Sequence, residues 1–380
     1  MSALKKTDKN SSFIIAEIGT SHNGSLQRAE ELITAAADSG ADCVKTQIVF
    51  ADEIIHPNTG EVSLPGGSIR LYDRFLELEQ NFNFYARIKE LTEDAGLKFL
   101  ASPFGTKSLD WLLNLDCDSI KIASPELNHF PLLRAAAASG RRLILSSGVS
   151  EMIDIEAALE TVTSSAPSDA PPAVLMHCIT SYPAPETEYK LRLLQTLYQN
   201  FNKRFNIALG VSDHSLDPLL VPCMAAAICP TVPCYIEKHI TLKNDDGGLD
   251  DPIALTPEQF AEMTAAVRNT GALRRTSGTD AALAALREQF GAERLEAVLG
   301  DSVKRLAPSE AANYGRTNRS VHALTNLAAG TILTSENTAL LRTEKILKPG
   351  ARPEHWNDLI GKRLRNDIPS GEGVTLSDIE

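Results

Sequence analysis

The chain has 380 residues, of which 43% are hydrophobic and 23% are charged, and its formal net charge is −12 at pH 7. This length exceeds what one hydrophobic core usually serves, so we expect a globular protein with one large and one smaller domain. The negative charge disfavours binding to nucleic acid or anionic membranes, and no run approaches the roughly 18 apolar residues of a membrane span.

The start of the chain, MSALKKTDKNSS, contains lysines but no apolar segment after them. A secretory signal needs such a segment, so we expect none here. The six cysteines form no C-x-x-C pair and lie mostly in apolar sequence, as is typical of reduced, buried thiols. These features predict a cytoplasmic protein.

Short apolar runs alternate with longer amphipathic runs over the first two-thirds of the chain. Helical patterns include 26–40, 84–96, 131–140 and 256–271, and several end at glycine, which favours a helix C-cap. The eightfold alternation predicts an α/β fold, a closed parallel (β/α)8 TIM barrel. An open doubly wound sheet is the alternative, but no G-x-G-x-x-G follows a strand. The predicted strands are 13–18, 43–48, 98–102, 119–124, 143–147, 173–178, 206–212 and 234–239.

The pattern changes after the last of these helices. Polar, helix-prone sequence is followed by short strand-like runs with turns between them. We therefore predict a barrel domain over 1–271, a connector over 272–317 and a small β-rich domain over 318–380.

Polar residues gather at the predicted C-terminal ends of the strands, where barrels of this kind hold their active sites. Residues i and i+2 share a face, so Ser212 and His214 should face the interior together, as should Glu237 and His239, while Lys238 faces the helices. The polar residues at or just beyond the strand ends are Glu17, Lys45, Gln47, Ser102, Lys121, Ser124, Glu126, Ser146, Ser147, Ser212, His214, Glu237 and His239.

Taken singly, a buried histidine or lysine is more often a hydrogen-bonded or ion-paired core residue than a ligand. That explanation does not extend to several buried charged residues gathered at one site, because each unpaired buried ion costs several kcal/mol. His214 and His239, on neighbouring strands, are placed to share a divalent metal, for which two nitrogen ligands favour Mn²⁺ or Mg²⁺ over structural zinc. Lys45 and Lys121, with the serine hydroxyls, form a local cation cluster suited to a phosphate and a carboxylate.

The motifs at these positions resemble the sialic acid synthase family, which condenses phosphoenolpyruvate with an N-acetylated hexosamine. They occur in order along nearly the whole chain, and the tail from about Asn318 resembles the family's small antifreeze-like (SAF) domain. The motifs are AEIGTSHNG (16–24), VKTQ (44–47), ASPF (101–104), IKIASPELN (120–128), LSSG (145–148), HCITSYPAP (177–185), GVSDHS (210–215), EKHITL (237–242) and GLDDPIALTP (248–257).

The resemblance implies a role for each candidate residue. His214 and His239 would bind the metal. Glu17 and Asp250 would act near the sugar, and Glu126 would orient or deprotonate the attacking water. Arg342 would reach the N-acyl group of a neighbouring subunit, which implies a domain-swapped homodimer. Phosphoenolpyruvate would be held by Lys45, Lys121, Ser102, Ser124, Ser146 and Ser212, and the sugar would face Gln47, Thr180 and Tyr182.

Departures from the family pattern leave the sugar open. Thr180 occupies a position where the sialic acid branch commonly has Asn. This chain has VKTQ where that branch has VKFQ, and Leu249 lies where the family usually has the sequence G-P-D. The candidates are N-acetylmannosamine, its 6-phosphate, or a deoxy diacetamido sugar leading to legionaminic or pseudaminic acid. Two other functions are weighed as well: a Schiff-base aldolase using Lys45 or Lys121, and a non-catalytic binding protein with the same fold.

Overall fold

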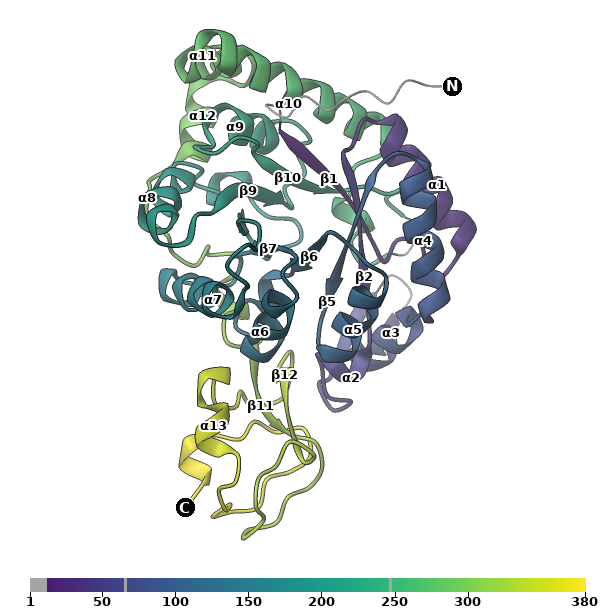
Figure 1. Cartoon of the computed structure of the whole chain (residues 1–380), viewed down its shortest axis with the longest axis vertical. Helices are drawn as coiled ribbons and strands as arrows, with labels where there is room; N and C mark the ends of the chain where they lie inside the picture. The colour runs from purple at the N-terminus through teal and green to yellow at the C-terminus, as the bar shows by residue number, and fades with distance from the viewer. Residues whose placement is uncertain (1–11, 65–66, 246–247) are drawn as a thin grey trace.

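The structure is a computed structural model that describes residues 12–64, 67–245 and 248–380 (Figure 1). The segment 1–11, where the sequence predicts no secretory signal, lies outside the described residues. In the described part of the chain, no helix has the length and apolar character needed to cross a membrane. All six cysteines are described, and each is a buried free thiol, as predicted.

Eight parallel strands form the central sheet, in the order β5-β2-β1-β10-β9-β8-β7-β6. The edge strands β5 and β6 lie against each other, so the sheet closes into a barrel. The predicted TIM barrel and all eight predicted strands are confirmed. The strands are β1 (Phe13–Gly19), β2 (Cys43–Ile48), β5 (Lys98–Pro103), β6 (Ser119–Ile122), β7 (Arg142–Ser146), β8 (Val174–Cys178), β9 (Ala208–Asp213) and β10 (Tyr235–His239).

Helices surround the sheet, and their apolar faces pack on its outer surface in one large core (Figure 1). Local sequence sets their ends: the Ser25 side chain caps the first helix, accepting from Arg28 N at 3.2 Å. The barrel helices are α1 (Leu26–Asp38), α4 (Phe82–Asp94), α5 (Thr106–Asn114), α6 (Phe130–Ala138), α7 (Met152–Ser165), α8 (Leu193–Phe205), α9 (Leu220–Ile228) and α10 (Pro257–Ser277).

Inside the barrel, an apolar layer lies below a polar one. Ile15, Leu100, Ile144, Met176 and Tyr235 form part of a separate buried cluster. Two positions further along the same strands, on the same face, stand Glu17, Ser102, Ser146, Cys178 and Glu237. The strand alternation therefore delivers the polar residues together at the C-terminal ends of the strands.

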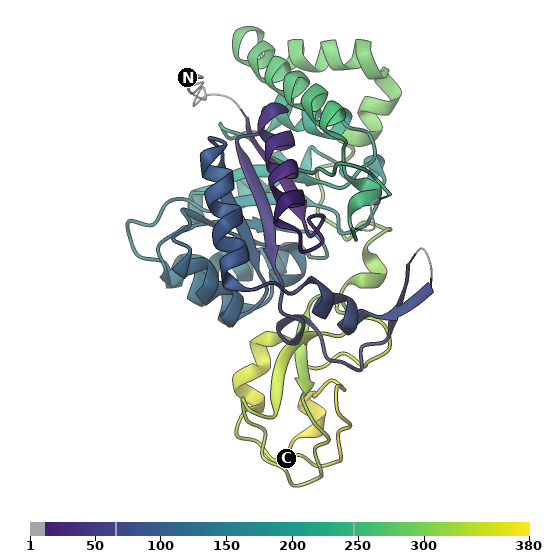
Figure 2. The same cartoon turned by 90° about the vertical axis from the view of Figure 1, so that its right-hand side faces the viewer.

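An excursion between β2 and β5 builds one side of the barrel mouth. It contains α2 (Ala51–Ile54), a hairpin of β3 (Glu61–Leu64) and β4 (Gly67–Arg70), and α3 (Leu71–Leu78). The hairpin projects from the body of the molecule (Figure 2). Apolar residues of α2 and α3 pack with Phe104 in their own buried cluster.

The C-terminal part begins with α10, which continues past the predicted boundary at residue 271. It ends at Gly278, whose φ of 88° is readily adopted only by glycine. Two more helices follow, α11 (Thr279–Phe290) and α12 (Ala292–Leu299). The small domain below the barrel in Figure 1 has antiparallel strands β11 (Arg319–Ala323) and β12 (Thr338–Arg342), a short α13 (Trp356–Leu359) and its own apolar core.

Candidate active site

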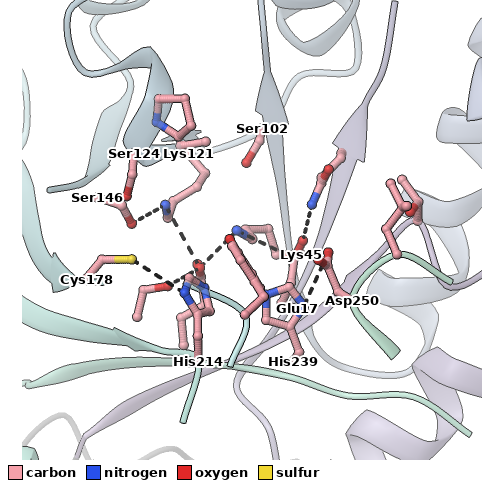
Figure 3. A pocket seen from close by; sticks show the side chains of 18 of the residues that line it. Glu17, Lys45, Ser102, Lys121, Ser124, Ser146, Cys178, His214, His239 and Asp250 are labelled. Atoms are coloured by element: carbon pink, nitrogen blue, oxygen red, sulfur yellow. Dashed lines mark hydrogen bonds and ion pairs between the residues drawn. The ribbon is translucent and has the colours of Figure 1, made fainter. Parts of the chain in front are cut away.

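A polar cavity of about 200 Å³ lies at the C-terminal ends of the barrel strands (Figure 3). It brings together all of the residues predicted for the site except Glu126 and Thr180. The predicted residues that line it are Glu17, Lys45, Gln47, Ser102, Lys121, Ser124, Ser146, Tyr182, Ser212, His214, His239, Asp250 and Arg342.

Glu237 is the charged centre of this cavity. Its Oε1 accepts hydrogen bonds from Lys45 Nζ at 3.0 Å and Ser212 Oγ at 2.9 Å, and Lys121 Nζ lies 4.0 Å away. Burial by itself raises the pKa of Glu237, but the two ammonium groups outweigh it and lower the pKa to about 2. Glu237 is therefore the counter-ion that allows two lysines to be buried side by side.

A second carboxylate, Glu17, lies on the other side of Lys45. Its Oε2 is 3.2 Å from Lys45 Nζ, and its Oε1 accepts from Gln47 Nε2 at 3.0 Å. Burial raises the pKa of Glu17 to about 7, against the lowering effect of Lys45. The pKa of Lys45 is raised by its two carboxylate neighbours although burial alone would lower it. Glu17 is thus the lining carboxylate suited to gain or lose a proton near neutral pH.

Hydroxyl groups and Lys121 form the opposite half of the cavity (Figure 3). Lys121 Nζ donates to Ser146 Oγ at 2.6 Å and to Ile122 O at 3.2 Å. Burial lowers the pKa of Lys121 to about 8, so its ammonium form predominates at neutral pH. Among the described residues, Ser102 Oγ is buried without a hydrogen-bond partner, which leaves it to bind a ligand.

The two predicted metal ligands face the same cavity. The ring centroids of His214 and His239 are 5.4 Å apart. His214 Nδ1 lies 2.8 Å from Ile179 O, a geometry in which Nδ1 carries the proton and Nε2 keeps its lone pair. Burial lowers the pKa of His239 well below its ordinary value, so that ring is neutral. Asp250 Oδ2 lies 3.7 Å from His239 Nδ1.

These groups fit a divalent metal held by two imidazoles, with water or substrate oxygens completing its shell. Within the described part of the chain, no group of three or more His, Cys, Asp or Glu side chains is arranged to hold a metal ion. A metal bound only by protein ligands is therefore not the arrangement that these residues offer. The two-histidine site stays a prediction.

Glu126 is not among the residues that line the cavity, and its predicted role towards the attacking water stays a prediction. Its fully buried carboxylate is bound by the guanidinium groups of Arg319 and Arg342, with Arg342 Nε 3.1 Å from Oε1. Burial alone would raise the pKa of Glu126, but the two arginines lower it. Because both of its oxygens are paired with cations, Glu126 anchors the small domain to the barrel.

Arg342 reaches the cavity of its own chain. Residues 300–318 are bonded to the same barrel, for example through Asn318 Nδ2 to Val149 O at 3.0 Å. Arg319 then enters beside Glu126 and also donates to Phe104 O at 2.7 Å. The resemblance implies that Arg342 serves a neighbouring subunit; in this chain it lines the cavity of its own barrel, and the cross-subunit role stays a prediction. A homodimer stays a prediction.

Other features of the site were missed or only partly predicted. Thr180 is not among the residues that line the cavity, and its Oγ1 is buried without a hydrogen-bond partner among the described residues. Tyr182 is half exposed and stacks on His214 at 4.3 Å between ring centroids.

Cys178 was missed by the sequence analysis. It lines the cavity with its Sγ 3.9 Å from His214 Nδ1, and the alternation of inward and outward residues along β8 would have indicated it. Lys238 faces away, as predicted, and its Nζ donates to Asp213 Oδ2 at 2.6 Å.

Fold and cavity together define a (β/α)8-barrel protein whose candidate active site combines strand-end side chains with one arginine of a C-terminal domain. Residues 32–278 match the NeuB family and residues 318–380 match the SAF domain. The chain belongs to the NeuB family.

Its relatives are similar over nearly their whole length. It is 29% identical to the N,N'-diacetyllegionaminic acid synthase of Legionella pneumophila, over 97% of this chain and 94% of that protein. It is 30% identical to the N-acetylneuraminate-9-phosphate synthase of Drosophila melanogaster, over 96% and 95%. The crystal structure of the spore coat polysaccharide biosynthesis protein SpsE of Bacillus subtilis superposes with a TM-score of 0.80 at 29% identity, covering 97% of this chain and 95% of that one.

Proposed function

We propose that the protein condenses phosphoenolpyruvate with an N-acetylated amino sugar and water, giving a sialic-type (nonulosonic) acid and phosphate. Similar proteins are named as synthases of such acids. The observation that carries the proposal is the cavity itself, in which two lysines and several serine hydroxyls line the same space as two imidazoles and three carboxylates. One half suits an anion and the other suits a polar carbonyl substrate.

Lys121, Ser124 and Ser146 supply the anion-binding half. Lys121 Nζ and the serine hydroxyls are positioned by bonds to one another and to the backbone, as with Gly148 N donating to Ser124 Oγ at 3.0 Å. A phosphate or carboxylate entering here meets an ammonium group that has no carboxylate within hydrogen-bonding distance, since Glu237 Oε1 lies 4.0 Å from it. Such charge-assisted bonds would hold phosphoenolpyruvate and stabilise the departing phosphate.

His214 and His239 would hold the divalent metal, which when bound polarises the sugar aldehyde as a Lewis acid. The methylene carbon of phosphoenolpyruvate then forms the C–C bond with that aldehyde carbon. Water adds at C2 of the resulting oxocarbenium ion, and the tetrahedral intermediate loses phosphate by C–O cleavage. Atoms balance: one phosphoenolpyruvate, one sugar and one water give one keto acid and one phosphate.

Glu17 is the carboxylate to which we assign the proton-accepting role that the resemblance implied for Glu126. It lines the cavity, and its pKa of about 7 suits a general base at neutral pH. Gln47 orients its carboxylate through the 3.0 Å bond from Nε2. Asp250 lies beside this group, where it would bind sugar hydroxyls.

The charges at the mouth favour a sugar without a second phosphate. Arg342 is the third cation lining the cavity, and it shares the Glu126 carboxylate with Arg319. In the loop after β10, Asp250 lines the cavity, whereas Asp251 is fully buried. A phosphate on the sugar placed beside Asp250 would be repelled by its carboxylate.

The Schiff-base alternative would use Lys121, because a lysine with a pKa of about 8 is more nucleophilic at neutral pH than an ordinary one. Borohydride in the presence of pyruvate separates the two functions. Covalent trapping on Lys121 would support the aldolase. The proposed condensation predicts no trapping, together with full loss of activity in a chelator.

A panel of candidate sugars, each with phosphoenolpyruvate and Mn²⁺, tests the proposal by phosphate release. We expect release that depends on the sugar, with neutral N-acetylated sugars faster than their 6-phosphates. His214→Ala is the inactive control. Absence of release with every sugar, together with simple ligand binding, would instead identify a non-catalytic binding protein.

A further inference from the structure

A carboxylate in the connector makes unusual contacts with the barrel. Glu310 is only 1% exposed, although it lies outside the barrel domain in sequence. Its Oε2 accepts hydrogen bonds from two backbone amides, Val149 N at 2.9 Å and Thr180 N at 2.8 Å. These amides belong to different loops, one after β7 and one after β8. A single oxygen atom therefore joins two loops at the barrel mouth.

The two loops touch each other at the point that Glu310 holds. Gly148 lies so close to Thr180 that any side chain at position 148 would collide with the Thr180 side chain. Val149 adopts a φ of 41°, a backbone conformation that is uncommon for a β-branched residue. Such a conformation persists only where surrounding contacts impose it, and the bonds to Val149 supply those contacts.

The loop after β7 leads directly to the anion-binding half of the cavity. Gly148 N donates to Ser124 Oγ at 3.0 Å, and Ser146 Oγ accepts from Lys121 Nζ at 2.6 Å. A second connector residue supports the same loop, because Lys304 Nζ donates to Ser147 O at 3.1 Å. A shift of this loop would move the hydroxyl groups that position Lys121.

The loop after β8 leads to the histidine half. Ile179, the neighbour of Thr180, holds His214 Nδ1 at 2.8 Å through its carbonyl oxygen. Tyr182, two residues further, stacks on the same imidazole at 4.3 Å between centroids. Movement of Thr180 would therefore turn the His214 ring.

We propose that Glu310 is a positioning residue for the reaction: it clamps the loops after β7 and β8 together and so sets the spacing between the two halves of the cavity. This inference rests on the proposed function for its kinetic consequence, but the clamp itself is a structural claim. It also gives the connector a purpose, because the segment that leads to the small domain carries the group that orders the barrel mouth.

Hydrogen–deuterium exchange tests the clamp without any reaction. Glu310→Leu removes the acceptor and leaves two buried amides unbonded, so peptides containing Val149 and Thr180 should exchange faster than in the wild type. Ser309→Ala is the matched control: it removes the 2.6 Å bond from the neighbouring Ser309 Oγ to Glu188, further along the loop after β8, and leaves both amides bonded to Glu310. Unchanged exchange at Val149 and Thr180 in Glu310→Leu would overturn the clamp.

Steady-state kinetics of phosphate release test the effect of the Glu310 clamp on the reaction. We expect kcat of Glu310→Leu to fall roughly 100-fold, since misplaced groups of this kind cost about that much. Glu310→Gln should stay within roughly threefold of the wild type, because an amide oxygen accepts the same two bonds. If Glu310→Leu does not fold, Glu310→Asp replaces it, as its shorter side chain cannot reach both amides.

The outcomes are distinct. A Gln variant as slow as the Leu or Asp variant, at equal folded fraction, would overturn the positioning role, as would equal losses in Ser309→Ala. A wild type that releases no phosphate while the exchange result holds would count against the proposed function and leave the clamp standing.

Discussion

Arg342 of the small domain and Glu126 of the barrel form a buried ion pair at the edge of the cavity, with Arg342 Nε 3.1 Å from Glu126 Oε1. Arg319 binds the other oxygen of the same carboxylate. One barrel carboxylate thereby fixes two arginines of another domain. Arg319 serves docking alone, because its side chain is fully buried, whereas Arg342 also lines the cavity.

Replacing Arg342 with alanine should therefore affect sugar binding more than phosphoenolpyruvate binding. The lysines that would hold phosphoenolpyruvate are untouched, and the small domain stays docked through Arg319. We expect the KM for the sugar to rise at least about tenfold, the loss of roughly one charge-assisted bond. Separate KM values for the two substrates measure this, and equal effects on both would contradict the assignment.

Mixing two impaired variants, assayed at a sugar concentration well below the raised KM of Arg342→Ala, tests whether Arg342 acts within its own chain. Arg342→Ala keeps an intact barrel, and His214→Ala keeps an intact small domain. The contacts within one chain predict no recovery of activity after the two proteins are unfolded and refolded together. Recovery would show that the small domain is exchanged between two copies.

The histidine pair should be essential for the reaction and for metal binding. His214→Ala or His239→Ala should abolish phosphate release without unfolding the protein. Calorimetric titration with Mn²⁺ provides a readout independent of turnover, and each variant should bind it much more weakly than the wild type. A variant that keeps most of its metal-dependent activity would rule out the two-histidine site.

The pH dependence of phosphoenolpyruvate binding should follow Lys121. Burial lowers its pKa to about 8, so the ammonium form is present below pH 8 and is lost as the pH rises above it. We expect the KM for phosphoenolpyruvate to increase by up to about tenfold per pH unit above pH 8, the slope of one proton. In Lys121→Arg the guanidinium stays charged, so this rise should disappear.

The buried ion pair between Lys238 and Asp213 should contribute strongly to the free energy of unfolding. Lys238 and Asp213 are opposite one another on β10 and β9, and both side chains are fully buried. Lys238→Met leaves the Asp213 carboxylate without its cation and should cost about 3–5 kcal/mol of unfolding free energy. Urea unfolding measures it, and the double variant with Asp213→Asn should lose less than the sum of the two single losses.

An exposed pair supplies the control for this experiment. Lys98 Nζ and Asp118 Oδ2 are 2.8 Å apart, but their side chains are 68% and 75% exposed. Lys98→Met should change stability by less than about 1 kcal/mol, because water screens such pairs. A similar loss at both pairs would show that burial is not what makes the inner pair strong.

The sequence alone determined the barrel and most of its cavity. Strand alternation has a period of two, so the inward positions of Lys45, Gln47 and Glu237, and the outward position of Lys238, follow from order along the chain. Strand ends in a parallel barrel meet at one mouth, which brings residues from distant motifs together. These regularities are local or topological, and they need no knowledge of side-chain packing.

Only the tertiary structure decided what each charge contacts. Glu126 and Arg342 are 216 residues apart, and Glu310 lies 161 residues from Val149, so no periodicity relates them. Their pairing depends on how the connector folds back over the barrel and where the small domain docks. Because a buried carboxylate takes whichever donors the fold presents, its role as base, counter-ion or anchor is set by three-dimensional contacts and not by its place in a motif.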